Sequence, residues 1–211
     1  MMIKLSKFDN FLSDINEILN DYDIKSTGKD YPAKDIAETN LSESQKKEIV
    51  SLMRVNHSGE VAAQGLYIGH SIFEKNKENR RSLLHTASEE KNHLEWCEKR
   101  ISELDGNTSI LNPIWFLGSV AIGIISSKGK YNRSLGFIEE TEKQVSEHLD
   151  NHLKKIPVED KKTITILEKM KSEEEMHGLK ANEQGAQEVS KQTKKIMELV
   201  SEIMKKTSYL I

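Results

Sequence analysis

Met53-Arg54-Val55-Asn56-His57-Ser58-Gly59-Glu60 ends in a glutamate, and Glu90-Lys91-Asn92-His93 begins thirty residues after it. The same order returns in the second half of the chain, where Glu142 precedes Glu174-Glu175-Met176-His177 by 32 residues. The pattern is therefore a glutamate followed by Glu-x-x-His, and the chain carries it twice. In four-helix bundles this is the ligand set of a two-metal site that is bridged by carboxylates.

The spacing of apolar residues around the four glutamates carries more weight than the motif. At this Glu and His content a Glu-x-x-His arises about 0.8 times by chance. Each glutamate, however, lies in a run with alternating steps of three and four, which is the core-facing stripe of a helix. The four stripes are Met53, Asn56, Glu60, Ala63, Tyr67; Leu83, Ala87, Glu90, Leu94, Cys97; Leu135, Ile138, Glu142, Val145, Leu149; and Leu167, Met170, Glu174, His177, Ala181. We therefore expect four carboxylates to point into one core.

Four carboxylates in one core need compensation, because burying an unpaired charge costs several kcal/mol. One solution is a metal-free helical interaction module in which the glutamates pair with Lys or Arg. No Lys or Arg lies in these stripes near the glutamates, however. Two divalent cations would balance the four negative charges. The sequence therefore favours the metal site.

The composition fits one helical domain over 42–211, preceded by an N-terminal helix and connector over 1–41. Charged residues make up 31% of the 211 residues and apolar ones 36%, with three Pro. A net charge of −3, without a basic stripe, excludes a nucleic-acid partner. The single cysteine, Cys97, excludes an internal disulfide and fits a reducing compartment. The acidic N-terminal region does not read as a signal peptide.

The hydrophobic periodicity predicts an all-α chain. A short amphipathic helix is expected over 5–20 and an irregular connector over 21–41. Bundle helices are expected over 43–74, 82–104, 134–155 and 160–186, with the first one starting at a capping box, Ser42-Glu43-Ser44-Gln45. A last amphipathic segment with Ile196, Leu199, Val200 and Ile203 either continues the fourth helix or packs as a separate short C-terminal helix.

The connection between the second and third bundle helices, 105–133, is the longest. One long crossover is the connectivity of ferritin-like four-helix bundles. Its segment 110–125 contains no charged residue and is too short to span a bilayer. It is either a crossover helix buried under the bundle or a segment for membrane contact and lipid-substrate access. Gly59, Gly65 and Gly69 in the first bundle helix indicate close helix packing, or, for Gly59, room beside the metal site.

The site chemistry follows from the ligand types. Four carboxylates and two imidazoles form an oxygen-rich set that suits iron or manganese, with positions left open for water, O₂ or substrate. By symmetry, Glu90 and Glu174 are expected to bridge both metals, with Glu60 and His93 completing one site and Glu142 and His177 the other. His148 is a candidate for the second shell of ligands, since it follows Glu142 by six residues. The other histidines are expected in packing or surface roles.

Several motifs resemble the demethoxyubiquinone hydroxylase family of ubiquinone biosynthesis. The resemblance covers about 42–205 and is carried, in order, by Leu52-Met53-Arg54-Val55-Asn56-His57-Ser58-Gly59-Glu60, Glu90-Lys91-Asn92-His93-Leu94, Leu111-Asn112-Pro113-Ile114-Trp115, Leu135-Gly136-Phe137 with Glu142, and Glu174-Glu175-Met176-His177. It implies a ferritin-like di-iron monooxygenase with the six ligands Glu60, Glu90, His93, Glu142, Glu174 and His177. His148 matches a family position that is linked to electron delivery.

The resemblance also implies a reaction and a location. The enzyme would use O₂ and an external reductant, with NADH as the candidate, to hydroxylate the ring of a methoxy-methyl-polyprenyl-benzoquinol (demethoxyubiquinol). Because this substrate has a polyprenyl tail, 110–125 is expected to contact the membrane surface, which makes the protein peripheral on the cytoplasmic face of the cell membrane. Other ubiquinone-biosynthesis proteins are candidate partners. The alternative enzyme class is another di-metal protein, either a ferroxidase or a manganese enzyme that consumes peroxide.

Overall fold

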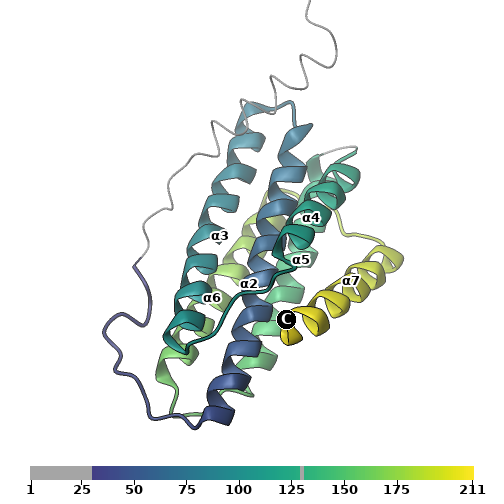
Figure 1. Ribbon diagram of the computed structural model, residues 1–211. Helices are drawn as coiled ribbons and strands as arrows, with labels where there is room; N and C mark the ends of the chain where they lie inside the picture. The colour runs from purple at the N-terminus through teal and green to yellow at the C-terminus, as the bar shows by residue number, and fades with distance from the viewer. Residues whose placement is uncertain (1–29, 129–130) are drawn as a thin grey trace, which may run out of the picture.

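The computed structural model describes residues 30–128 and 131–211 and shows an all-helical protein in these ranges (Figure 1). Four long helices form the bundle, namely α2 (Glu43–Ile72), α3 (Lys77–Glu103), α5 (Tyr131–Leu153) and α6 (Lys161–Glu183). Two further helices, α4 (Asn112–Ser126) and α7 (Lys191–Leu210), lie on one side of it. The prediction of an all-α bundle with one long crossover is confirmed, and the helix expected over 5–20 falls outside the described residues.

Capping residues explain where the helices begin and why one boundary prediction was wrong. The Ser42 hydroxyl accepts from the backbone N–H of Gln45, so the predicted capping box is present. The turn after α2 was expected over 75–81 but covers only 73–76. The Asn76 side chain accepts from two backbone N–H groups, those of Glu78 and Asn79. This cap places the charged residues 77–81 in the first turns of α3.

The end of α6 separates it from α7. Gly185 has φ +90° and follows the C-cap residue Gln184. The N–H of Gly185 donates to the carbonyl of Asn182, and the N–H of Ala186 donates to that of Ala181. This is a Schellman motif, which stops an α-helix. The last amphipathic segment is therefore a separate helix.

The crossover helix α4 packs along the outside of α2, so the interpretation as a helix buried under the bundle is wrong. Only Gly123 of α4 is fully buried. A Cβ added at Gly69 would lie 2.3 Å from the carbonyl oxygen of Val120, and one at Gly65 would lie 2.6 Å from that of Phe116. These two glycines therefore permit the close approach of α4. Gly59 has no atom within 4 Å of such a Cβ, so packing does not explain it.

A buried arginine holds the connector before α2 against the bundle. The Arg100 side chain on α3 has no exposed surface and donates to Glu38 at 2.7 and 3.0 Å, to Asp160 at 2.9 Å and to Glu103 at 3.1 Å. Its planar guanidinium can satisfy several carboxylates at once. The contacts tie the connector residue Glu38 to α3 and to the start of α6.

Two larger apolar clusters fill the bundle, and a third, smaller one lies where α2 and α3 meet α4. In each bundle helix, the candidate ligands lie in sequence between residues of the two larger clusters. One cluster contains Met53, Trp96, Leu149 and Met170, and the other contains Tyr67, Ala87, Ile138 and Ala181. Among the described helices, none is long and apolar enough to cross a membrane.

Candidate metal centre

The structure brings all six predicted ligands together in the middle of the bundle. They form two groups of four, and within each group one ligand atom per residue lies within 4.8 Å of the others. The first group is Glu60, Glu90, His93 and Glu174, and the second is Glu90, Glu142, Glu174 and His177. Glu90 and Glu174 belong to both groups. The four carboxylates are at most 2% exposed, so this is a buried acidic cluster.

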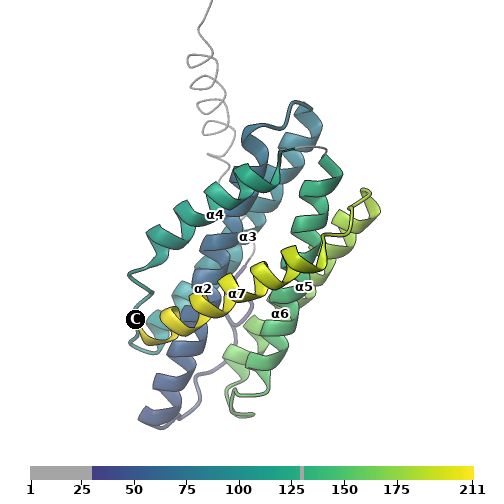
Figure 2. The same cartoon turned by 90° about the vertical axis from the view of Figure 1, so that its right-hand side faces the viewer.

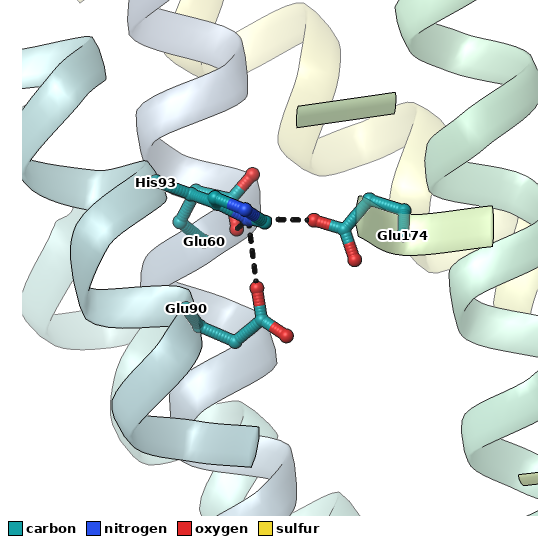
Figure 3. Close-up of side chains that lie close together, drawn as sticks. All are labelled: Glu60, Glu90, His93 and Glu174. Atoms are coloured by element: carbon teal, nitrogen blue, oxygen red, sulfur yellow. Dashed lines mark ion pairs between the residues drawn. The ribbon is translucent and has the colours of Figure 1, made fainter. Parts of the chain in front are cut away.

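The shared glutamates lie between the two imidazoles. Nδ1 of His93 is 3.0 Å from Oε2 of Glu90 and 2.9 Å from Oε1 of Glu174 (Figure 3). Nδ1 of His177 is 3.0 Å from Oε1 of Glu90 and 3.4 Å from Oε2 of Glu174. Each shared carboxylate thus turns one oxygen to each histidine. The contacts of each histidine to the glutamate of its own helix follow from the Glu-x-x-His spacing, because residues three apart lie on one face of a helix. The contacts of His93 to Glu174 and of His177 to Glu90 depend on the packing of α3 against α6.

Several ligand atoms in the cluster lack a hydrogen-bond partner. Both oxygens of Glu90, Oε2 of Glu142, Oε1 of Glu174 and Nδ1 of His93 are buried and make no well-aligned hydrogen bond within the described ranges, although all except Oε2 of Glu142 lie 2.9–3.0 Å from another candidate ligand. Buried polar atoms are satisfied in the large majority of cases, and these five face a common centre. Cations would satisfy all of them. An oxygen-rich set with two imidazole nitrogens fits hard, first-row divalent metals.

Burial and neighbouring charges shift the pKa values of several candidate ligands. Burial raises the pKa of Glu60 to about 8 and raises that of Glu142 well above its ordinary value. Burial disfavours the charged forms of His93 and His177, but the neighbouring carboxylates outweigh it and raise both pKa values. Metal ligation requires these groups to be deprotonated, so metal binding must release protons.

Two further glutamates contact the outer nitrogens of the histidines, and we did not predict them from the sequence. Nε2 of His93 is 2.8 Å from Oε2 of Glu173, and Nε2 of His177 is 3.5 Å from Oε2 of Glu89. The contacts cross between α3 and α6. A carboxylate on the outer nitrogen fixes the tautomer and orients the ring with Nδ1 toward the metal. The available signal was an acidic residue directly before each Glu-x-x-His.

Tyr67 is a third residue that sequence analysis did not single out for function. Its hydroxyl on α2 donates to Oε1 of Glu142 on α5 at 2.5 Å. Burial and the charge of Glu142 raise the pKa of Tyr67, so the hydroxyl stays protonated and remains a donor. Tyr67 therefore holds the carboxylate of Glu142 in one orientation.

The two halves of the centre differ in their access to solvent. A groove of about 610 Å³ between α5 and α6 reaches Glu142 and Glu174, and a cavity of about 20 Å³ reaches His177. His93 has no exposed surface, and its ring lies 5.3 Å from that of Trp96. The Glu142 half is therefore the side that a small molecule can approach.

His148 follows Glu142 by six residues, and this spacing does not bring its side chain to the buried acidic cluster. Six residues correspond to about 9 Å along a helix, and the His148 ring lies 3.9 Å from that of His152. Burial and the nearby Lys205 and Lys155 lower the pKa of His148 to about 3. No contact to the six ligands is found for it in the described part of the chain.

The chain is similar to a described protein family and to several curated proteins. A family model described as "Ubiquinone biosynthesis protein COQ7" matches residues 47–208. The "3-demethoxyubiquinol 3-hydroxylase" of Legionella pneumophila (strain Paris) is 42% identical over 209 residues, 98% of each chain. Proteins of the same name from Chromobacterium violaceum and Coxiella burnetii (strain RSA 493) are 42% and 43% identical, over 88% and 87% of this chain and 90% and 85% of theirs.

Proposed function

The chain belongs to the family of the ubiquinone biosynthesis protein COQ7, and from this we propose that it hydroxylates the ring of a demethoxyubiquinol with O₂ at a di-iron centre. The relatives named 3-demethoxyubiquinol 3-hydroxylase, which match most of this chain, support the reaction class and a quinol substrate. The ring would carry methoxy, methyl and polyprenyl groups. An external reductant is required, and NADH is our candidate.

One observation carries the assignment of the centre. Glu90 and Glu174 take part in both four-residue groups, and each turns one oxygen toward each histidine. Two cations held by such a set would share these two carboxylates. We therefore assign Glu90 and Glu174 as bridging ligands, Glu60 and His93 as ligands of one iron, and Glu142 and His177 as ligands of the other.

The protein residues supply position, charge and exclusion of water. Two bound irons would activate O₂ with electrons from the reductant. Four carboxylates balance the charge of two Fe²⁺ ions in a dry core, where an uncompensated charge would be costly. Glu173 and Glu89 accept from the outer nitrogens of His93 and His177 and keep both rings oriented. Tyr67 keeps one oxygen of Glu142 occupied as a hydrogen-bond acceptor.

The open side of the centre and the helix α4 are two separate features. The groove is lined mostly by charged and polar residues, and α4 does not line it. The groove between α5 and α6 reaches Glu142 and Glu174, which belong to the more accessible half of the cluster. The uncharged segment 110–125 exposes apolar side chains on α4. We propose that this segment contacts the membrane surface and that the protein is peripheral on the cytoplasmic face of the cell membrane.

The test is oxygen insertion into a quinol. The protein is loaded anaerobically with Fe(II), mixed with a demethoxyubiquinol of shortened tail and a reductant, and exposed to isotopically labelled O₂. Mass spectrometry should find a product one oxygen atom heavier that carries the label. Glu90→Ala should abolish it, whereas Glu98→Ala, at an exposed position of α3 outside the groove, should retain it.

Other outcomes identify the alternatives. Rapid oxidation of Fe(II) with an unchanged quinol would indicate a ferroxidase. Consumption of peroxide by the manganese-loaded protein, again with an unchanged quinol, would indicate a peroxide-consuming enzyme. Either result would overturn the proposed reaction.

A further inference from the structure

Helix α7 turns its apolar stripe away from the bundle. Ile196, Leu199, Val200 and Ile203 follow the i, i+3, i+4, i+7 spacing that normally faces a core. Here Ile196 and Leu199 are each 62% exposed, and Ile203 is 51% exposed. On the opposite side of the helix, Ser208 is fully buried. The sequence shows a core-facing stripe, but the fold leaves it uncovered within the described residues.

Helix α4 has the same property on the same side of the molecule. Ile114, Leu117 and Ile125 are 61–67% exposed. Figure 2 shows α4 and α7 in front of α2 and α5, and Figure 1 places both on the same side of the bundle. The protein thus presents two apolar helices on one face. Exposed apolar area of this kind marks an interaction surface.

The charges beside these stripes indicate the occupant. Segment 110–125 carries no charge, whereas α7 carries five lysines and two glutamates, Glu198 and Glu202, which gives it a formal net charge of +3. Lys194 pairs with Glu140, and Lys205 pairs with Glu202. Lys191 and Lys195 are exposed and form no ion pair with the described residues. An apolar stripe with lysines beside it is typical of a helix that lies in the plane of an anionic bilayer.

We propose that α7 is a second membrane-contact element, which together with α4 docks this face of the protein onto bilayers that contain anionic lipids. The apolar stripe of α7 would lie at the boundary of the acyl chains, and Lys191 and Lys195 would lie at the headgroup phosphates. The inference rests on the proposed function, because a polyprenyl quinol resides in the bilayer and must be delivered from it. It extends the membrane contact from α4 alone to a face made by two helices.

Sedimentation of the full-length protein with lipid vesicles tests the proposal. Vesicles of phosphatidylcholine alone are compared with vesicles that also contain phosphatidylglycerol. Leu199→Ser and Ile203→Ser should each weaken binding about tenfold, which corresponds to the loss of one buried aliphatic side chain. Val158→Ser is the matched control, because Val158 is 70% exposed and lies in the turn before α6, outside α4 and α7. It should bind as the wild type does.

A second pair of variants tests how the lysine charges of α7 contribute to vesicle binding. Lys195→Glu should weaken binding to anionic vesicles by about fivefold or more, and should have no effect with phosphatidylcholine alone. Lys161→Glu makes the same change of net charge at the exposed start of α6 and should have no effect. Equal binding by all five substituted proteins would overturn the proposal. A change of solution mass in Leu199→Ser with unchanged vesicle binding would do so too, because the stripe would then join copies of the chain.

Activity separates this proposal from the proposed function. Leu199→Ser should hydroxylate a short-tailed quinol in solution at the wild-type rate and lose activity only with a long-tailed quinol in vesicles. If no quinol is hydroxylated but anionic vesicles are still bound through α7, the proposed reaction is refuted and the proposed membrane contact is supported. If short-tailed quinol is hydroxylated and Leu199→Ser behaves as wild type with vesicles, the membrane face fails alone.

Discussion

Glu173→Ala tests whether the contact to the outer nitrogen of His93 supports the metal centre. Oε2 of Glu173 lies 2.8 Å from Nε2 of His93, which is a hydrogen bond of ordinary length. Loss of such a partner behind a metal ligand typically lowers metal affinity about 10- to 100-fold. This corresponds to about 1.4–2.7 kcal/mol of binding free energy. The symmetric contact of Glu89 to His177 is longer, at 3.5 Å, so Glu89→Ala should have the smaller effect.

The assay is an anaerobic competition between the protein and a chelator for Fe(II) or Co(II). Glu175→Ala is the matched control, because Glu175 is more than half exposed and follows the ligand Glu174 directly. Glu173→Gln keeps a carbonyl oxygen as acceptor, and its affinity should lie between those of the wild type and Glu173→Ala. Circular dichroism of the metal-free proteins should show unchanged helix content. If Glu173→Ala binds metal as tightly as Glu175→Ala, the argument about the outer nitrogen is refuted.

Three further predictions concern the fold around the centre. Arg100→Met should lower the free energy of unfolding by about 3–5 kcal/mol in denaturant titrations, because it leaves buried carboxylates without their partner; a loss below 1 kcal/mol would contradict the role of this cluster. Gly69→Ala should lower the free energy of unfolding by about 1–3 kcal/mol, because the added Cβ clashes with the backbone of Val120. Gly118→Ala is the control: no atom lies within 4 Å of its added Cβ, so it should be neutral or stabilise the protein by up to about 1 kcal/mol. Equal effects of the two substitutions would refute the close packing of α4. Burial lowers the pKa of His152 to about 2, so the contribution of its neutral form to stability is present above pH 6.5 and is lost as the pH falls. Between pH 7 and 5, the free energy of unfolding of the wild type should fall by at most about 2 kcal/mol more than that of His152→Gln. Identical falls would show that His152 does not titrate in this way.

The fold was largely readable from the sequence because apolar spacing and helix caps are local signals. The stripes around Glu60, Glu90, Glu142 and Glu174 identified the four bundle helices and the residues that meet in the core. The start of α3 was misplaced because a charged run resembles a loop, and the cap that decides the boundary is a single residue, Asn76. Local signals therefore gave the elements and missed some of their ends.

The parts that sequence analysis missed depend on contacts between helices. The pairing of Glu173 with His93 crosses from α6 to α3, and the hydrogen bond from Tyr67 to Glu142 crosses from α2 to α5. Neither is set by spacing along one helix. The place of 110–125 was equally open, since the same uncharged composition fits a buried helix and an exposed apolar one. The exposure of the α4 side chains decides between them, because only Gly123 of this helix is buried.

Iron per chain tests the central claim most directly. The protein is loaded anaerobically with Fe(II), desalted and analysed for metal, alongside Glu142→Ala. The account predicts close to two iron atoms per wild-type chain, because two groups of four ligands share Glu90 and Glu174, and a clear loss of iron in the variant. A folded wild-type chain that retains no iron above background would contradict the account.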